Sequence, residues 1–182
     1  MKHLPLSYNR VYCYRKDKEL MKIPWKSRKT RFIVEAAVLG AIYAAITILL
    51  APISYGQVQI RVAEALTVLP YFTPSAVPGL FVGCILANIY NGNLMDIIFG
   101  SLASLIAAVL SRKMPKSWLV PLPPVVVNGL IIGWVLHIVE GLPYWLTVGT
   151  VTLGQVAACY GLGYPLLLVL QKNKHKIFGT DG

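Results

Sequence analysis

Long apolar runs, separated by proline, glycine or charged residues, fill the chain between residues 33 and 170. A helix that crosses a lipid bilayer needs about 20 mainly apolar residues. The candidate stretches are Ile33–Ala51, Arg61–Phe72, Thr73–Tyr90, Asn93–Ser111, the stretch from the prolines at 121–124 to Val139, and Pro143–Leu170. This pattern predicts an all-α integral membrane protein, built as a bundle of six transmembrane helices.

Local signals refine these stretches. Arg61–Phe72 is too short to span a bilayer alone. Thr73 followed by Pro74 is typical of a helix start, with a capping hydroxyl and proline at the first helical position. Asn93, with an acid three residues later, is a second start signal. Pro165 predicts a kink in the last stretch, close to Gly161.

The distribution of charge divides the chain into three parts. Only 13% of the residues are charged, about half the share of a soluble domain. Residues 1–32 carry ten Lys or Arg against two acids, residues 33–170 carry four of each, and residues 171–182 carry three Lys and one Asp. We predict a basic N-terminal arm, a six-helix membrane domain and a basic C-terminal tail. Residues 1–20 are a candidate start-site extension, because Met21 precedes a basic flank of more usual length.

The basic residues also predict the orientation of the bundle. Short cytoplasmic loops of membrane proteins collect Lys and Arg. With the N-terminus in the cytoplasm, the internal segments are 1–32, the turn near Thr73, 111–117 and 171–182, and they hold sixteen of the seventeen basic residues. Only Arg61 lies elsewhere. The count predicts six crossings with both termini cytoplasmic.

The basic arm permits a second interpretation. Tyr8, Tyr12, Tyr14 and Trp25 lie among its charges, a mixture that resembles an RNA-binding tail. A topology anchor on anionic lipid explains the same residues, and the membrane context favours it. We therefore expect the lipid bilayer as the partner of this arm, and no nucleic acid.

Small residues recur every four positions on the first apolar stretch. They form two adjacent rows, Ala37, Ala41 and Ala45 beside Ala36, Gly40 and Ala44. Small residues at this spacing let helix backbones approach closely in lipid. The broad face of the two rows suits a partner helix from another chain, and packing inside the bundle is the open alternative. The glycine rows on the third and fifth stretches need only internal packing.

Charged residues at membrane depth are candidates for function, because burying them is costly. Arg61 and Glu64 lie three residues apart, on one face of a short helix. They form either a self-compensating pair at the outer interface or a polar wall facing a cavity, and the short helix favours the wall. Asp96 is equally compatible with a role at the helix start and with a ligand contact.

Uncharged polar residues within the apolar stretches extend this candidate set. Asn88, Asn128 and Gln155 either bridge helices or form a ring of hydrogen-bonding groups, because an unpaired amide is expensive in such surroundings. Trp145 fits an aromatic belt at the membrane interface at least as well as a stacking platform for a ligand.

Signatures of enzyme chemistry are absent from the sequence. It has no G-x-x-x-x-G-K-[ST] phosphate loop, no G-x-S-x-G nucleophile elbow, and no His, Cys or carboxylate cluster at zinc spacing. Cys13, Cys84 and Cys159 form no C-x-x-C pair, and a free Cys packs as a small hydrophobic side chain. We expect no enzyme activity, no metal and no cofactor.

Long motifs of specific composition run through the membrane domain. They are Gln57-Val-Gln-Ile-Arg-Val-Ala-Glu-Ala-Leu-Thr-Val-Leu-Pro-Tyr71, Gly79-Leu-Phe-Val-Gly-Cys-Ile-Leu-Ala-Asn88, Asp96-Ile-Ile-Phe-Gly-Ser101, Asn128 and Leu142-Pro-Tyr-Trp-Leu-Thr147. In these motifs the chain resembles the QueT family of queuosine-precursor transporters. The resemblance covers essentially all of residues 33–170.

The resemblance implies a function and partners. Members of this family are substrate-binding (S) components of energy-coupling factor (ECF) transporters, with six membrane helices. They capture a 7-deazaguanine and dock on a shared module of one transmembrane T component and two ATPases, so that ATP is hydrolysed by the partner subunits. This implies a multi-pass protein of the bacterial plasma membrane, with Ala37, Ala41 and Ala45 as its candidate docking surface.

A 7-deazaguanine has a donor edge that suits a carboxylate, a carbonyl that suits Arg or an amide, and a flat face for an aromatic ring. The substrate-binding candidates are Glu64 or Asp96 for the donor edge, Arg61, Asn88, Asn128 and Gln155 as supporting contacts, and Trp145 for stacking. Family members commonly carry an acid where this chain has Gln155 after Gly154. The substrate preference here could therefore differ.

Three alternatives remain at this point. The chain could be a self-sufficient, proton-coupled carrier of a purine-like base, with Glu64 or Asp96 as the proton site. It could be an S component for a different vitamin-like substrate. It could also be a membrane scaffold with no small ligand.

Overall fold

The computed structural model describes residues 28–55 and 59–173. The chain divides into two compact units, Met1–Val34 and Glu35–Gly182, and the contacts discussed below lie within the second unit. The predictions for the basic arm up to residue 27, for the extension 1–20 and for the tail beyond residue 173 lie outside the described residues.

Helices make up the described chain, which contains no strand in either of its two segments. In chain order they are α2 (Arg28–Leu49), α3 (Ala51–Ser54), the 3-10 helix η1 (Val62–Tyr71), α4 (Ala76–Asn91), the π-helical segment η2 (Asp96–Gly100), α5 (Ser101–Arg112), the 3-10 turn η3 (Ser117–Leu119), α6 (Leu122–Glu140), α7 (Tyr144–Val156), the π-helical segment η4 (Ala157–Gly163) and α8 (Tyr164–Lys172). The prediction of an all-α fold is confirmed.

Three helical stretches are long and apolar enough to cross a membrane, namely Arg28–Leu49, Ser117–Glu140 and Tyr144–Lys172. Val62–Tyr71 and Ala76–Asn91 are apolar but shorter. A 3-10 helix rises about 2.0 Å per residue, so η1 extends roughly 20 Å, less than the hydrocarbon core of about 30 Å. The short second stretch therefore does not span alone, as the sequence predicts, while the six crossings remain a prediction.

The helix starts agree only partly with the sequence signals. Asn93 does cap its helix, because its Oδ1 accepts a hydrogen bond of 3.0 Å from the Met95 N–H. The signal at Thr73 is wrong in detail: α4 begins at Ala76, without a side-chain cap. The hydroxyls of Thr73 and Ser75 instead donate to Oε2 of Glu35, at 3.1 and 2.8 Å. They tie the start of α4 to α2.

The irregularity expected near Pro165 takes the form of a π-helical segment. Here η4 joins α7 to α8, and Pro165 follows in the first turn of α8. Gly163, at the end of η4, packs directly on η1, since a Cβ there would lie 3.1 Å from the carbonyl oxygen of Ala65. The last helical stretch thereby supports η1.

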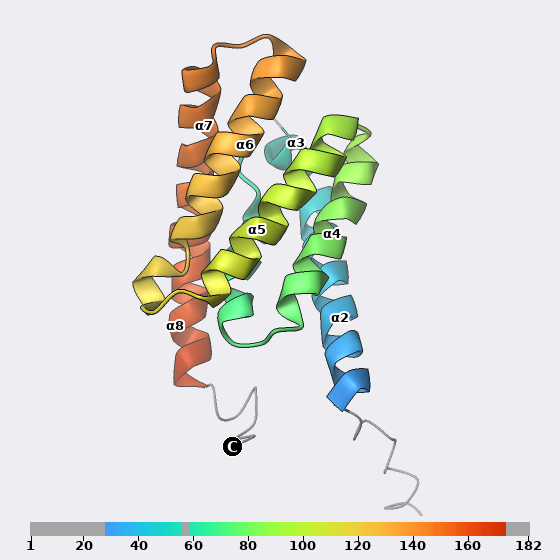
Figure 1. The fold of residues 1–182 in the computed structure, drawn as a ribbon, viewed down its shortest axis with the longest axis vertical. Coiled ribbons are helices and arrows are strands. Elements are labelled where there is room, and N and C mark those ends of the chain that lie inside the picture. The colour runs from blue at the N-terminus through green and yellow to red at the C-terminus, as the bar shows by residue number, and fades with distance from the viewer. Residues whose placement is uncertain (1–27, 56–58, 174–182) are drawn as a thin grey trace, which may run out of the picture. The chain divides into compact units, whose positions relative to one another are not determined.

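Neighbouring helices pack mainly as consecutive pairs. Figure 1 shows α6 and α7 running antiparallel and joined by a short connection at the top, with α4 and α5 joined at the same end. Between α2 and α4 the backbones almost touch: a Cβ on Gly79 would lie 2.6 Å from the Ala36 carbonyl oxygen, and one on Gly83 would lie 2.5 Å from that of Gly40. Only glycine permits this approach.

Candidate functional site

A cluster of buried polar residues surrounds the start of η1, which contacts α4, α5, η4 and α8. Arg61 is 2% exposed, Glu64 is fully buried, and Asp96 on η2 is 2% exposed. Arg61 has an extended backbone immediately before η1. In a 3-10 helix, side chains three residues apart lie on the same side. The local fold therefore turns Arg61 and Glu64 toward the same interior region.

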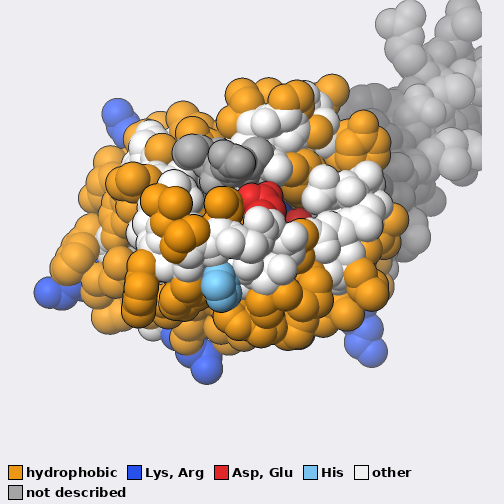
Figure 2. All heavy atoms as spheres, turned by 90° about the horizontal axis from the view of Figure 1, so that it is seen from above, with side chains coloured by type: hydrophobic (Ala, Val, Ile, Leu, Met, Phe, Trp, Pro, Cys, Tyr) orange, Lys and Arg blue, Asp and Glu red, His pale blue; other side chains and the backbone are white. Residues whose placement is uncertain are grey.

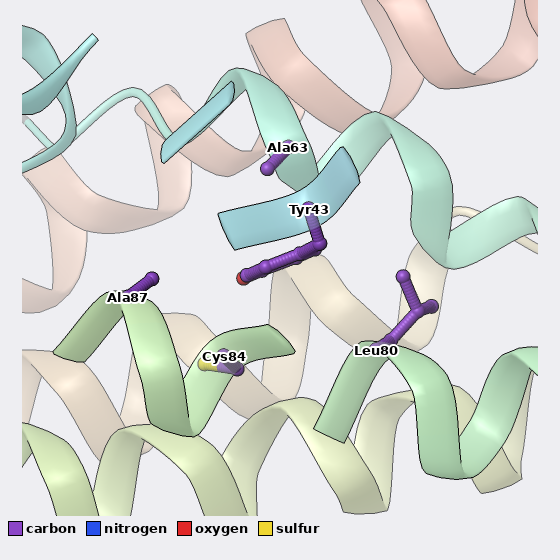
Figure 3. Packing of buried hydrophobic residues seen from close by; sticks show 5 residues of the cluster. All are labelled: Tyr43, Ala63, Leu80, Cys84 and Ala87. Carbon is purple, nitrogen blue, oxygen red and sulfur yellow. The ribbon is translucent and has the colours of Figure 1, made fainter. Parts of the chain in front are cut away.

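Glu64 is held by one of its two carboxylate oxygens. Its Oε1 accepts a hydrogen bond of 2.6 Å from the Tyr43 hydroxyl on α2 and one of 3.2 Å from the Ser104 hydroxyl on α5. Figure 3 shows the ring of Tyr43 between η1 and α4, among Ala63, Cys84 and Ala87. The other oxygen, Oε2, is buried without a hydrogen-bond partner. One oxygen fixes the carboxylate and the other is free to accept.

Arg61 is buried with most of its donors unused. Its Nη1 lies 3.9 Å from the sulfur of Cys84, and its guanidinium lies over the Tyr55 ring, 5.3 Å from the centroid. The Nε and Nη2 atoms have no partner, and within the described chain no ion pair joins Arg61 to Glu64 or Asp96. The interpretation of Arg61 and Glu64 as a self-compensating pair at the interface is therefore wrong: both are buried, and they do not neutralise each other by contact.

Asn88 and Asp96 form a second part of the cluster, where α4 meets η2. The Asn88 amide donates to the Asp96 carbonyl at 2.8 Å and to the Ser101 hydroxyl at 3.3 Å. Its Oδ1 has no partner. The Asp96 carboxylate accepts only a long contact of 3.4 Å, from Asn91 on Oδ2, and its Oδ1 has no partner. Asp96 is the less satisfied of the two buried acids.

Gly100 brings the two parts of the cluster together. A Cβ at this position would lie 3.1 Å from the Asn88 amide nitrogen and 3.9 Å from Nη1 of Arg61. A larger residue would press on the Asn88 side chain. Because Gly100 has no side chain, the Asn88 amide on α4 and the Arg61 guanidinium before η1 can both approach this point on η2.

Asn128 on α6 and Gln155 on α7 are two further buried amides, and no hydrogen bond of the described residues joins Asn128 to Arg61, Glu64 or Asp96. Both side chains are 2% exposed. Neither amide atom of Asn128 has a partner, while Oε1 of Gln155 accepts a contact of 3.5 Å from the Cys159 thiol. Next to Gln155, Gly154 allows the chain before η1 to pass closely, since a Cβ there would meet the carbonyl oxygen of Gln59.

Trp145 does not belong to this cluster. Its side chain is 77% exposed at the start of α7, and its ring packs against Tyr144 at a centroid distance of 5.0 Å. The position fits the aromatic belt, and the expectation that Trp145 stacks on a ligand gains no support. The aromatic rings beside the cluster are those of Tyr43 and Tyr55.

Sequence reasoning missed Tyr43, Tyr55 and Ser104. Tyr43 and Ser104 reach the cluster from apolar stretches that the small-residue pattern dominates. A hydroxyl in the middle of such a stretch is a signal, because it needs a partner in the bundle. Tyr55 follows the end of α3, and its hydroxyl donates to the Ala87 carbonyl at 2.6 Å. Nothing local in the sequence indicates that contact.

The unpartnered atoms define what the cluster can bind. Leaving a buried polar atom unsatisfied costs about 1–3 kcal/mol, and more when the atom is charged, so each such atom is a candidate contact for a ligand. The acceptors are Oε2 of Glu64, Oδ1 of Asp96, Oδ1 of Asn88 and Oδ1 of Asn128, and the donors are Nε and Nη2 of Arg61 and Nδ2 of Asn128. This set suits a small ligand with both donor and acceptor edges.

Figure 2 views the bundle from the end at which α4 joins α5 and α6 joins α7. Figure 2 shows acidic side chains near the middle of that end face, with the clearly visible Lys and Arg side chains at its edge. No group of three or more His, Cys, Asp or Glu residues in the described segments has the geometry to hold a metal ion.

The fold and the cluster indicate a class of protein: a helical membrane protein with buried polar residues inside its bundle, which is typical of small-molecule transporters. Residues 33–172 match the QueT transporter family, and the chain belongs to that family. It is 27% identical over 151 residues to the queuosine precursor transporter QueT of Lactococcus lactis subsp. cremoris strain MG1363, an alignment that covers 74% of this chain and 89% of that protein. No solved structure matches the chain significantly.

Family membership settles three predictions. The protein is a transporter and not an enzyme, it is a multi-pass protein, and it is located in the bacterial cell membrane. The resemblance described for the motifs between Gln57 and Thr147 is confirmed by the family match over residues 33–172.

Proposed function

We propose that this protein is the substrate-binding component of an energy-coupling factor transporter, which captures a queuosine precursor of the 7-deazaguanine type. It docks on a module of one T component and two ATPases, and those ATPases drive uptake with ATP. Six membrane crossings with both termini in the cytoplasm are part of this proposal. Its support is family membership, the name of the Lactococcus relative and the polar cluster around η1.

The observation that carries the proposal is the set of buried polar atoms without partners. A 7-deazaguanine has N–H groups along one edge and a carbonyl oxygen beside them. Oε2 of Glu64 suits the N–H edge, and Nε and Nη2 of Arg61 suit the carbonyl, by the same matching that governs recognition of bases in nucleic acids. Asn88, Asn128 and Gln155 supply amides around them, and Asp96 supplies a second acid.

Docking is supported by the division of the small residues on α2. The row Ala36, Gly40 and Ala44 faces α4, whereas Ala37, Ala41 and Ala45 are exposed. An apolar groove of about 380 Å³ runs beside the exposed row, between α2 and α4. Its lining residues are Ala36, Ala37, Gly40, Ala41, Pro78, Gly79, Val82 and Leu86. A helix of the T component could approach this surface closely, because no large side chain of α2 intervenes.

Equilibrium binding to the purified protein tests the proposed substrate. Isothermal titration calorimetry in detergent would compare queuine, the aminomethyl and cyano 7-deazaguanine precursors and guanine, with adenine as a control for non-specific uptake into the micelle. We expect at least one 7-deazaguanine to bind far more tightly than adenine. If none binds more tightly than about 1 mM, a binding free energy near 4 kcal/mol, the proposal fails.

Co-purification tests the proposed partners. The tagged protein would be expressed with and without a T component and its two ATPases, and the membrane extract would be passed over the affinity column. We expect all three partners in the eluate. An eluate that contains this protein alone, although the partners are present in the membrane, would contradict the docking part of the proposal and leave the binding part standing.

A further inference from the structure

The charges inside the polar cluster do not balance. Arg61, Glu64 and Asp96 are the charged side chains that the described part of the protein buries. With both acids ionised, the cluster carries one excess negative charge. A buried charge without a counter-charge is strongly unfavourable, and proteins avoid it by pairing or by neutralisation. The described chain buries no second positive charge, so the excess is removed either by a cation that the ligand supplies or by a proton.

The two acids differ in how well the protein already stabilises them. Glu64 accepts from two hydroxyls, those of Tyr43 and Ser104, at 2.6 and 3.2 Å. The Asp96 carboxylate has only the 3.4 Å contact from Asn91, and its Oδ1 has no partner. Hydrogen bonds from hydroxyls stabilise a carboxylate without neutralising it, so Glu64 is prepared to remain an ion and to accept from a neutral N–H group. Asp96 is the acid that lacks stabilisation.

The charge of Arg61 favours ionised Asp96 from a distance but is already counted in this balance. Arg61 makes no ion pair with Asp96 within the described segments, and its guanidinium is engaged with the Tyr55 ring and the sulfur of Cys84. Its free donors, Nε and Nη2, match a carbonyl oxygen of the ligand. A metal ion does not fit either, because the described residues supply no group of three metal ligands.

We propose that the site selects a base that carries a protonated amine, and that Asp96 is the counter-charge of this amine. The inference rests on the function proposed above and narrows its substrate class. A cationic substituent would form a charge-assisted hydrogen bond with Oδ1 of Asp96, which otherwise stays buried and unpaired. A neutral base with the same ring would leave that oxygen unpaired and the excess negative charge in place.

Two ligands that share the ring and differ in this charge test the inference. The purified protein would be titrated at pH 7 with 7-aminomethyl-7-deazaguanine, whose amine is protonated, and with 7-cyano-7-deazaguanine, which is neutral. We expect the aminomethyl base to bind at least tenfold more tightly, the discrimination typical of one charged hydrogen bond. This comparison uses the wild-type protein and does not depend on the folding of any variant.

Matched variants assign the charge to Asp96. Asp96→Asn should reduce the difference between the two bases to less than about threefold, mainly by weakening the aminomethyl base. Glu64→Gln should weaken both bases to a similar extent, because Glu64 faces the ring that they share. Glu140→Gln, at an exposed position near the end of α6, should change neither affinity.

The possible results distinguish failure of this inference from failure of the proposed function. If neither of these bases nor queuine binds, the proposed function is wrong. If the cyano base binds as tightly as the aminomethyl base, the function stands and the charge preference is wrong, which would mean that a proton neutralises the cluster. If wild type prefers the aminomethyl base and Asp96→Asn keeps the full preference, Asp96 is not the counter-charge.

Discussion

The two faces of α2 carry side chains of similar size in opposite surroundings. The inner face, with Gly40 and Ala44, is buried against α4, and the outer face, with Ala37, Ala41 and Ala45, is exposed. In the sequence the two rows look alike, since both repeat small residues every four positions. The comparison teaches that such spacing identifies a helix built for close approach and does not say which neighbour it approaches.

The inner face also connects packing with the proposed substrate site. Tyr43 lies one turn from Gly40, and its hydroxyl donates to Glu64. The close approach of α2 to α4 therefore helps to position a hydroxyl group of the polar cluster. No side-chain hydrogen bond of the described residues links the outer row to the cluster. Changes on the inner face should therefore disturb folding and substrate binding, and changes on the outer face should disturb docking alone.

The largest effect should come from bulk at the inner contact. Gly83→Leu would place a Cβ 2.5 Å from the carbonyl oxygen of Gly40, where backbone and not a flexible side chain would have to move. Overpacking of this kind costs roughly 3 kcal/mol, and we expect a much lower unfolding temperature and no ligand binding. Gly149→Leu is the control, because no atom lies within 4 Å of a Cβ there, and it should fold normally. Thermal unfolding in detergent checks both, and equal stability of the two variants would contradict the close contact.

Next in size is the removal of charge from the cluster. Glu64→Gln keeps the shape of the side chain but makes it a weaker acceptor for the N–H edge of the base. Loss of a buried charged partner typically costs about 2–5 kcal/mol, so we expect affinity to fall at least tenfold while the protein remains folded. Calorimetry on the purified variant checks this. Unchanged binding would remove Glu64 from the proposed site.

A smaller effect should follow from loosening the same carboxylate. Tyr43→Phe removes the 2.6 Å hydrogen bond to Oε1 and leaves the ring in place. A hydrogen bond to a charged group contributes about 1.5–3 kcal/mol, and since Ser104 still holds Oε1, we expect binding to weaken by roughly fivefold. Tyr90→Phe, at an exposed position on α4, is the control and should bind like wild type. If Tyr43→Phe and Tyr90→Phe bind equally well, Tyr43 does not position Glu64 for the ligand.

The smallest effect on binding should come from the outer face. Ala41→Leu adds bulk where α2 is exposed, and we expect substrate affinity to change by less than about twofold. The same bulk would separate the helices at a docking interface and forfeit many small contacts, so co-purification with the T component and ATPases should be lost. Val126→Leu, at an exposed position on α6, should preserve both. A variant at Ala41 that loses ligand binding as well would assign the outer row to internal packing.

Sequence reasoning predicted the fold class because apolar length and the position of proline determine where helices form. It also predicted buried positions for six polar residues, because a polar side chain within a long apolar run avoids lipid by facing the interior of the bundle. These residues are Arg61, Glu64, Asn88, Asp96, Asn128 and Gln155. It did not predict that η1 is a 3-10 helix or that Asp96–Gly100 forms a π-helical segment. These helix types depend on the packing of η1 and η2 against helices that are distant in the sequence.

The sequence could not predict the contacts within the cluster, for the same reason. The bond between Tyr43 and Glu64 joins residues on different elements, and so does the one between Ser104 and Glu64. Periodicity assigns a residue to a face of its own helix but says nothing about which helix lies opposite. Trp145 shows the converse: an aromatic residue near a polar motif lies outside, because its helix turns that side chain away from the bundle.

The central claim is that this protein binds the substrate and that other subunits supply the energy. The most direct measurement is uptake of radiolabelled 7-aminomethyl-7-deazaguanine into lipid vesicles that contain either this protein alone or this protein with the T component and both ATPases. The account predicts uptake only with the complete module and ATP. Uptake by the protein alone, driven by a proton gradient and without any ATPase, would contradict it and establish a self-sufficient carrier.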